Sequence, residues 1–461
     1  MKIVISIPYF FPLSFGGGQV YVRRLATELL QRGYEVTVLT STFWQKHGGM
    51  YHITNYKYEG LKVTGISLNP KAMSEADKYS ELSPILLEGV RNMIKKLKPD
   101  IVHINGLKPG LITVCNQLEI PSVVTAHHPG FACPVSTLLK PDESLCEARA
   151  DRSVCVPCCC LWKCSRRFHG KLLELIPPQI YRAVGKKLNR YEKIPYLGRG
   201  LMFPWLVEKR MEGQRVLLRE SQSIISPSRA MKRLLLRNNV PEKKIFLLPH
   251  GIEPLEWSPV EKLNDRPIRF GYIGRIDYAK GFHILLQAIE KMPSAINCEL
   301  HIFGDAQNEW DKKYFIDSLS RYKGKARIYN YGYISNDKLL DAYKKIDILV
   351  VPSIYLEVFG LVILEGFSAG RPMIVSKSGG PEELVRDGVD GFVVERNNAD
   401  VLADAMQRFV DNPELTARMA QQIPHVRTIQ EHVDEVEKIY LSLCFKTNRV
   451  VVSSSQQSPA P

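Results

Sequence analysis

Short apolar runs alternate with amphipathic segments along the first half of the chain. The apolar run KIVISI (residues 2–7) precedes QVYVRRLATELLQRG (19–33), in which apolar residues recur at helical spacing, and the apolar run YEVTVLT (34–40) follows. Apolar runs of four to eight residues between turn residues are typical of buried strands, whereas a 3.6-residue period is typical of helices. The alternation therefore predicts a parallel sheet with helices on both faces.

The same alternation begins again at residue 268, after the proline-containing segment PHGIEPLEWSP (249–259). We therefore predict an α/β protein with two doubly wound, Rossmann-like domains, residues 1–250 and 251–445, which face each other across a cleft. In sheets of this kind, ligands bind outside the carboxyl ends of the strands. The polar, low-complexity segment at residues 446–461 predicts a disordered tail.

A cysteine-rich and basic stretch from about residue 133 to residue 219 interrupts the first series and predicts an insertion. We expect the first residues, MKIVISIPYFFPL, to form a buried strand and not a secretory leader, so a disulfide framework is not expected. Cys155 and Cys158 have the two-residue spacing of a structural zinc site, and Cys133 and Cys146 could complete four thiolate ligands. Free thiols in an ordered loop are the alternative, and the spacing leaves both open.

The net charge of +14 is concentrated in this insertion. Residues 163–215 hold thirteen Lys and Arg against four Asp and Glu, a balance of +9, interleaved with apolar and aromatic residues. Such a segment is typical of docking on an anionic membrane surface, and a solvated helical face is the alternative. No apolar run reaches 18 residues and no nucleic-acid-reading motif is present. We expect a cytoplasmic protein, peripheral on the cytoplasmic membrane face, without a nucleic-acid partner.

Two acids, Glu357 and Glu365, flank a candidate anion site in the second domain. ILVVPS (348–353) reads as a buried strand, and the continuous apolar run after Gly360 predicts a helix over residues 361–369. The first N–H groups of a helix are free and lie at the positive end of its dipole, so the predicted helix start lies between the two acids.

Glycine-rich and basic loops follow the first strand of each domain. In the first domain, FGGGQV (15–20) opens a helix, and Gly17 and Gly18 allow a close backbone approach to a phosphate. In the second, GRIDYAKG (274–281) carries Arg275 and Lys280, which could both reach a diphosphate. Each loop taken alone is weak evidence.

These motifs together resemble those of the family 4 retaining glycosyltransferases, which have the GT-B fold. The resemblance rests on GRIDYAKG, PSIYLEVFGLVILEGFSAGRPMIVSKSGG and EELVRDGVDGFVV, with the acid pair matching the family's E-x7-E motif, and it covers roughly residues 1–132 and 220–430. It implies that Glu365 holds the ribose of a nucleotide-sugar and that Glu357 faces the donor sugar. The other residues that it places at the donor are Gly17, Gly18, His127, Arg275, Lys280, Phe359, Gly360 and Leu361.

The resemblance also implies the reaction. A sugar moves with retention from a UDP- or GDP-sugar to a glycan or lipid-linked acceptor in cell-surface polysaccharide or glycolipid synthesis. Fixed cations and helix amides stabilise the leaving diphosphate, so neither a catalytic metal nor another cofactor is expected. His128, His250, Gly366 and Phe367 depart from the common family pattern and leave the base and sugar open. The alternative is a non-catalytic sugar-nucleotide-binding or membrane-scaffold protein on the same fold.

Overall fold

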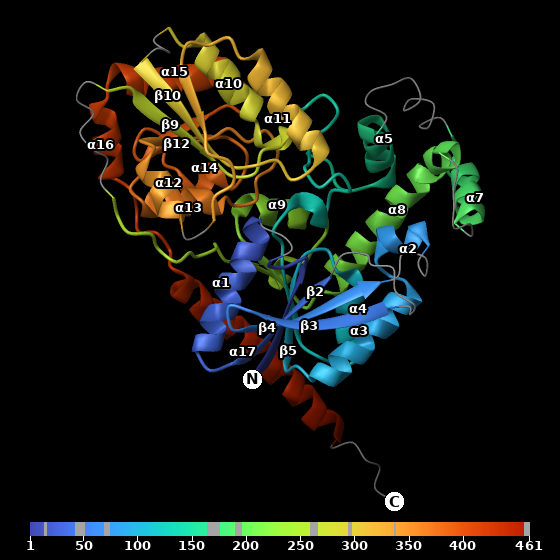
Figure 1. Cartoon of the computed structure of the whole chain (residues 1–461). Coiled ribbons are helices and arrows are strands. Elements are labelled where there is room, and N and C mark those ends of the chain that lie inside the picture. The colour runs from blue at the N-terminus through green and yellow to red at the C-terminus, as the bar shows by residue number, and fades with distance from the viewer. Residues whose placement is uncertain are drawn as a thin grey trace, which may run out of the picture. The chain divides into compact units, whose positions relative to one another are not determined.

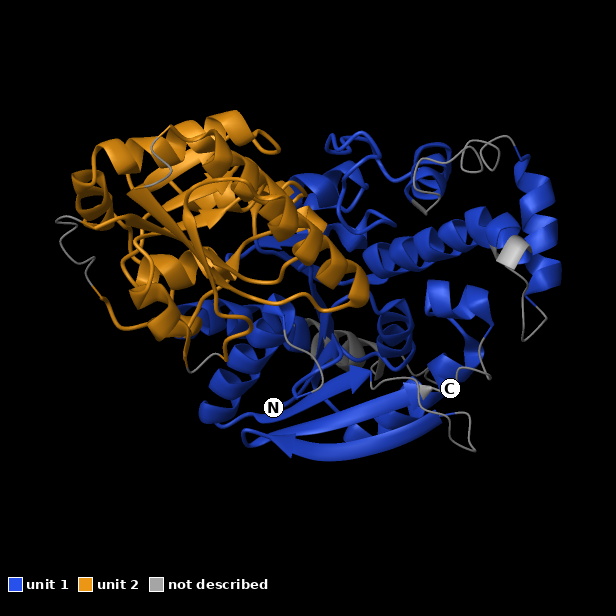
Figure 2. Ribbon diagram, turned by 45° about the horizontal axis from the view of Figure 1, so that its top comes forward, with its two compact units in different colours: residues 1–227, 231–249, 430–461 blue, residues 228–230, 250–429 orange. Residues whose placement is uncertain are grey.

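The chain forms two compact units (Figure 2). The first comprises residues 1–227, 231–249 and 430–461, and the second comprises residues 228–230 and 250–429. The computed structural model describes residues 1–12, 16–41, 51–68, 74–163, 176–189, 196–258, 266–293, 297–335 and 338–455, and side chains as far as residue 445 with the exception of 163, 196, 197 and 199.

The first unit is built on an eight-stranded sheet with the order β3-β4-β2-β1-β5-β6-β7-β8. Neighbouring strands are parallel except for the hairpin of β3 and β4. β1 is buried over five consecutive residues, as expected for a strand covered on both faces. The strands are β1 (Lys2–Pro8), β2 (Glu35–Ser41), β3 (Tyr51–Tyr58), β4 (Leu61–Leu68), β5 (Ile101–Asn105), β6 (Ser122–Thr125), β7 (Ser223–Ser226) and β8 (Ile245–Leu247).

Helices connect these strands, and several begin at a side-chain cap. Ser74 caps the first turn of α2 in a reciprocal arrangement with Asp77, and the Ser83 hydroxyl accepts the Leu86 N–H at 3.1 Å at the start of α3. The helices of the first unit outside the insertion are α1 (Gly17–Gln31), α2 (Glu75–Ser80), α3 (Pro84–Leu97), α4 (Pro109–Gln117), α9 (Arg229–Arg237, whose first two residues group with the second unit) and α17 (Ile429–Ser455).

The insertion contributes α5 (Arg152–Lys163), α7 (Pro178–Leu188) and α8 (Tyr196–Glu220) (Figure 1). Tyr181 of α7 is buried against Trp205 and Leu206 of α8, and Cys160 of α5 is buried against Met211 of α8. Several apolar residues of the basic stretch therefore supply ordinary core contacts, whereas Ile180 is exposed. Residues 164–175 and 190–195 of that stretch lie outside the described residues.

The second unit is a six-stranded parallel sheet with the order β11-β10-β9-β12-β13-β14. Numbered from β9, this is the order 3-2-1-4-5-6 of doubly wound nucleotide-binding sheets, with its switch point between β9 and β12. The strands are β9 (Ile268–Ile273), β10 (Cys298–Phe303), β11 (Arg327–Asn330), β12 (Ile348–Val351), β13 (Met373–Ser376) and β14 (Gly391–Val394). The helices are α10 (Phe282–Lys291), α11 (Glu309–Arg321), α12 (Leu339–Lys344), α13 (Leu361–Ser368), α14 (Pro381–Leu384), α15 (Ala399–Asp411) and α16 (Glu414–Ala420).

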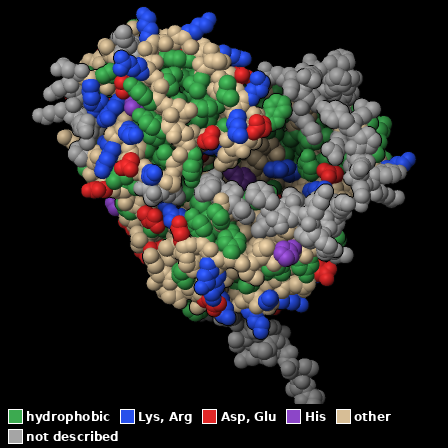
Figure 3. All heavy atoms as spheres, in the orientation of Figure 1, with side chains coloured by type: hydrophobic (Ala, Val, Ile, Leu, Met, Phe, Trp, Pro, Cys, Tyr) green, Lys and Arg blue, Asp and Glu red, His purple; other side chains and the backbone are tan. Residues whose placement is uncertain are grey.

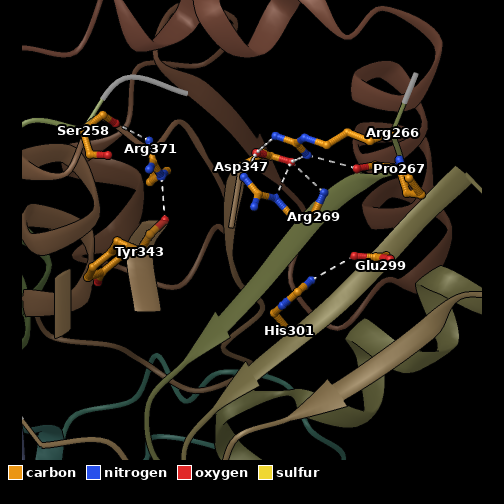
Figure 4. A network of polar contacts seen from close by, with 9 residues as sticks. All are labelled: Ser258, Arg266, Pro267, Arg269, Glu299, His301, Tyr343, Asp347 and Arg371. Atoms are coloured by element: carbon orange, nitrogen blue, oxygen red, sulfur yellow. Dashed lines mark hydrogen bonds and ion pairs between the residues drawn. The ribbon is translucent and has the colours of Figure 1, made fainter. Parts of the chain in front are cut away.

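A buried ion network fixes the amino ends of β9 and β12 (Figure 4). The fully buried Asp347 accepts hydrogen bonds from the Arg266 guanidinium at 2.8 and 2.9 Å and from the Arg269 guanidinium and backbone N–H, each at 2.8 Å. Burial opposes ionisation of Asp347, but the two arginines outweigh it and lower the pKa of the carboxyl. Nearby, the buried Arg371 donates to the Tyr343 and Ser258 carbonyls at 2.7 and 2.6 Å.

The C-terminal segment from Gln430 packs with the first unit, although the sequence pattern assigned residues 251–445 to the second domain. Arg32, directly after α1, makes ion pairs with Asp434 and Glu437 of α17 at 2.7 and 2.6 Å. Tyr440 of α17 lies 2.6 Å from His103 of β5. The backbone of α17 continues to Ser455, within the segment expected to be a disordered tail, and residues 456–461 lie outside the described residues.

Within the described part of the chain, no helix combines the length and apolar character needed to cross a bilayer.

The fold confirms the prediction of two doubly wound α/β domains. On the face shown in Figure 3, the second unit carries basic and acidic side chains interspersed with one another and not gathered in one basic patch.

Candidate functional site

Glu357 lies in the loop that follows the carboxyl end of β12, beside the switch point of the second unit's sheet. Its carboxylate forms an ion pair with Lys280, and the Ser353 hydroxyl donates to it at 3.3 Å. The Glu357 N–H donates to the Ser378 carbonyl, and the Gly380 N–H donates to the Glu357 carbonyl, both at 2.8 Å. The backbone of Glu357 is therefore held by the loop that follows β13.

Lys280 is charged in this environment. Burial opposes the ammonium charge, but the Glu357 carboxylate and Tyr355 outweigh burial and raise the pKa of Lys280 above its usual range. The ammonium also lies 5.3 Å from the centre of the Tyr355 ring. The lysine thus presents a permanent positive charge at the carboxyl end of the sheet.

Arg275 follows β9 and supplies a second cation. Its Nε donates to the Asp277 carboxylate at 2.6 Å, and 47% of its side chain remains exposed, so the rest of the guanidinium is accessible to a ligand. The same Asp277 accepts the backbone N–H of Lys280 at 3.0 Å and caps the short turn Tyr278–Lys280. One carboxylate therefore positions both basic residues of the loop.

Glycine at position 281 permits this loop to lie against the loop after β12. Gly281 has φ +71°, and a side-chain Cβ there would overlap the Pro352 carbonyl oxygen. A larger residue would push the turn that carries Lys280 away from Glu357.

α13 begins directly after Glu357, as the sequence predicts. Gly360 precedes the helix with φ +94°. Glycine has no side chain that could cap the first N–H groups of α13, which begin at Leu361. Phe359 is buried beside His250, with ring centres 4.9 Å apart. Glu365 projects from the second turn of α13 and is buried. The structure thus brings Arg275, Lys280, Glu357 and the α13 N-terminus to one edge of the second unit's sheet.

The remaining predicted residues lie in the first unit. Gly17 and Gly18 form the first turn of α1, and Gly17 is exposed. His127 follows β6, its Nε2 lies 2.7 Å from Oδ1 of Asn105, and its ring centre lies 4.8 Å from that of Tyr21. Burial, then nearby His103 and His128, lower the pKa of His127 well below 6.5, so this imidazole is neutral at physiological pH.

A chain of buried polar side chains extends from this histidine to α17. The Tyr21 hydroxyl lies 2.9 Å from Nε2 of His432. The other ring nitrogen of His432, Nδ1, lies 2.8 Å from the Pro249 carbonyl oxygen. Sequence reasoning missed Tyr21 and His432, because they are 411 positions apart and share no motif. It also missed Asp277, although the motif GRIDYAKG contains this residue.

A cavity of about 180 Å³ opens at the carboxyl ends of β1 and β2 in the first unit. Ser6, Pro8 and Ser41 line it, together with Lys108 and Glu81. The Lys108 ammonium donates to the Ser41 hydroxyl and to the Glu81 carboxylate, both at 3.1 Å. This is the position at which open α/β sheets bind ligands.

The structure does not support the zinc hypothesis. Among the described residues, no group of three or more His, Cys, Asp or Glu side chains is arranged to hold a metal ion. Burial, followed by the neighbouring thiols, raises the pKa of Cys155 to about 12 and that of Cys158 to about 11, and burial raises that of Cys133. Cys146, the fourth expected ligand, is likewise a free cysteine.

Models of two glycosyltransferase families match the chain, one in each unit. The model described as Glycosyltransferase Family 4 matches residues 15–157, and that described as Glycosyl transferases group 1 matches residues 255–426. An uncharacterized glycosyltransferase of Methanocaldococcus jannaschii is 31% identical over 207 residues, which are 42% of this chain and 52% of that relative. The chain spans about half the length of the first curated relatives it matches.

Solved structures share the fold over almost the whole chain. Sucrose-phosphate synthase from Thermosynechococcus elongatus has a TM-score of 0.61 at 20% identity, covering 98% of this chain and 99% of that chain. The Anabaena protein HepE, in complex with UDP-glucose, has a TM-score of 0.58 at 16% identity, covering 98% and 100%. The fold is GT-B, and the family matches together with the relatives support a glycosyltransferase of this type.

Proposed function

We propose that the chain is a retaining glycosyltransferase that moves a sugar from a UDP- or GDP-sugar to a glycan or lipid-linked acceptor in cell-surface polysaccharide or glycolipid synthesis. One observation carries the proposal: Arg275, Lys280 and the N-terminus of α13 lie at the switch point of the second unit. Two cations beside a helix N-terminus are suited to a diphosphate.

The reaction follows from the charge that develops as the donor breaks. The bond between the sugar's anomeric carbon and the diphosphate oxygen breaks, and the acceptor oxygen forms a bond to the same face of that carbon. The diphosphate takes the electron pair and then the acceptor's proton, so no protein base is required. Arg275, Lys280 and the α13 amides stabilise the departing negative charge, and a divalent metal is not needed for that task.

The other residues take supporting roles in this proposal. We assign Glu365 to the ribose hydroxyls, Glu357 to the donor sugar, and the backbone of Phe359, Gly360 and Leu361 to the phosphates. From the first unit, we assign Gly17 and Gly18 to the donor loop and neutral His127 to the donor sugar. The UDP-glucose bound to the Anabaena neighbour is consistent with the donor class. Lys108 and Glu81 in the first unit's cavity are our candidates for acceptor contacts.

A panel of nucleotide-sugars tests the donor directly. A ligand that binds only the folded protein raises its melting temperature, so one base and sugar should stand out in a thermal-shift experiment. Purified protein should then transfer or slowly hydrolyse that donor in the presence of EDTA. Nuclear magnetic resonance should show the product with the donor's anomeric configuration. A donor that binds without transfer or hydrolysis would instead support the non-catalytic binding protein.

Removal of Glu365 gives a sharper test of the ribose assignment. We expect Glu365→Ala to weaken binding of the nucleoside diphosphate by about 1–3 kcal/mol, because ribose hydroxyls lose a charged acceptor. Calorimetry measures this directly, with the exposed Glu395→Ala in the same unit as the control. Unchanged affinity in a folded Glu365→Ala protein would contradict the assignment.

Docking of residues 163–215 on the cytoplasmic membrane face is a separate part of the proposal. Its support is the +9 balance, since each Lys or Arg near an anionic surface contributes about 1 kcal/mol. We expect the protein to float with anionic liposomes at low salt and to be released by added salt. Reversal of five of these charges should abolish flotation, whereas unchanged flotation would show that the segment is only structural.

A further inference from the structure

A groove of about 480 Å³ lies along α10 and α11 in the second unit, outside the site described above. From α11 it is lined by Trp310, Tyr314 and Asp317, which are spaced at four and three residues and so share one face of the helix. From α10 it is lined by Gln287 and His283, again four residues apart. The volume falls in the range of about 300–1,000 Å³ that is typical of ligand sites.

Aromatic side chains form the walls of this groove and are held in place. The Tyr314 hydroxyl accepts the His283 backbone N–H at 3.0 Å and lies 2.7 Å from the His283 ring nitrogen Nδ1. Tyr278 stacks on the His283 ring with centres 4.6 Å apart and planes 12° apart. Tyr322, at the far end of α11, donates its hydroxyl proton to the Ala326 carbonyl at 3.3 Å. The walls are therefore formed before any ligand arrives.

Trp310 stands out from this wall because 84% of it is exposed. Large aromatic side chains are mostly buried in folded proteins, and exposed ones are enriched where a ligand covers them. α11 has no fully buried residue, so the exposed indole is not the by-product of a helix packed tightly on its other face.

The chemistry of the lining selects among possible occupants. Its charges balance, with Lys313 and Asp317 paired at 3.1 Å, so a polyanion such as nucleic acid finds no excess of cations. A partner helix would need apolar anchors at helical spacing, but the exposed apolar residues of α11, Trp310 and Ile316, are six positions apart and point about 120° from each other. Flat aromatic faces beside amide, carboxylate and hydroxyl groups suit the apolar face and hydroxyl edge of a sugar ring.

We propose that this groove binds a neutral oligosaccharide at a site separate from the donor site. Tyr278 belongs to the same short turn as Lys280, so one end of the groove adjoins the loop that carries the basic residues. A glycan chain held there would stay beside the second unit between encounters with the active site. The binding step itself does not depend on the proposed transfer reaction.

Binding of defined oligosaccharides to the full chain tests the proposal. Maltoheptaose, cellohexaose and mannohexaose are titrated separately, with tryptophan fluorescence and calorimetry as readouts, and a heparin hexasaccharide serves as the anionic comparison. We expect at least one neutral probe to bind and the heparin fragment to fail. Trp310→Ala should weaken that binding about tenfold, as expected for loss of one aromatic contact, and Gln287→Ala should weaken it about threefold.

Ile316→Ala is the matched control, because Ile316 is also exposed on α11 but does not line the groove. It should bind the probe like the unmodified protein. Trp310→Ala should also keep its melting temperature and its affinity for the nucleoside diphosphate, which separates the groove from the donor site. The proposal is overturned if no neutral probe binds, if heparin alone binds, or if Trp310→Ala binds as tightly as Ile316→Ala.

Discussion

Both units wind parallel strands outward from a switch point, between β1 and β5 in the first unit and between β9 and β12 in the second, yet the side chains near the two switch points differ. In the second unit, Arg275 and Lys280 follow the central strand and face acids, with 47% and 25% of their side chains exposed. In the first unit, His103 on β5 is fully buried and His127 is held neutral. Both sheets place a ligand site at the carboxyl ends of their strands, whereas the loops decide which side chains that site offers.

The comparison predicts that charge removal in the second unit has the largest effect on activity. Arg275→Ala and Lys280→Ala should each cost roughly 2–4 kcal/mol of transition-state stabilisation, because each cation faces the departing diphosphate. Steady-state transfer assays give this cost from kcat/KM. Lys291→Ala removes an exposed lysine of the same unit that pairs with the exposed Asp400, and should leave activity unchanged. A folded double variant with normal turnover would end the assignment.

The neutral histidines of the first unit predict a loss of stability in mild acid. Burial lowers the pKa of His103 to about 3 and that of His128 to about 4, below the unfolded value of 6.5. The unfolded state therefore binds more protons below pH 6.5, so stability is complete above that pH and falls as the pH drops. Between pH 6.5 and 5.0, His103 alone should account for about 2 kcal/mol.

Hydrogen exchange followed peptide by peptide at pH 7.0, 6.0 and 5.0 can separate the two units. Peptides of β5 and β6 should lose protection, after correction for the intrinsic pH dependence of exchange, before those of β12 and β13. His103→Gln should reduce this difference. Equal losses in both units, with no change in His103→Gln, would show that the buried histidines do not set the acid response.

A smaller effect is expected at the contact between His103 and α17. Tyr440→Phe removes the hydroxyl that lies 2.6 Å from His103 Nδ1 and leaves that buried nitrogen without this partner. A cost of about 1–3 kcal/mol in the free energy of unfolding is expected. Denaturant unfolding measures it, with Tyr329→Phe on the exposed edge strand β11 as the control. An unaffected protein would mean that α17 contributes little to the first unit.

Much of the fold could be predicted because its signals are local. The apolar run at Ile348–Val351 and the glycine before Leu361 set the bounds of β12 and α13 within a few residues, and the structure confirms them. The return of α17 to the first unit could not be predicted in this way. Its ion pair between Arg32 and Glu437 joins residues 405 positions apart, and neither residue carries a local signal of the other.

The residues of the candidate site likewise fall into those with a local sequence signal and those without one. Arg275, Lys280 and Glu357 were found because each lies within a short motif next to a buried strand. The zinc hypothesis used cysteine spacing, which does not report how side chains are arranged in space, and among the described residues no three such side chains are arranged to hold a metal ion. The role of Asp277 in placing both cations depends on side-chain geometry, which periodicity does not contain.

The placement of α17 has a consequence for how the chain folds during synthesis. His432 and Tyr440 contact Tyr21 and His103 in the interior of the first unit, yet the ribosome makes them only after the whole second unit. These contacts in the first unit's interior can therefore form only after the second unit has been translated. Domains commonly fold in order from the N-terminus. In this chain, the domain that begins first is completed last.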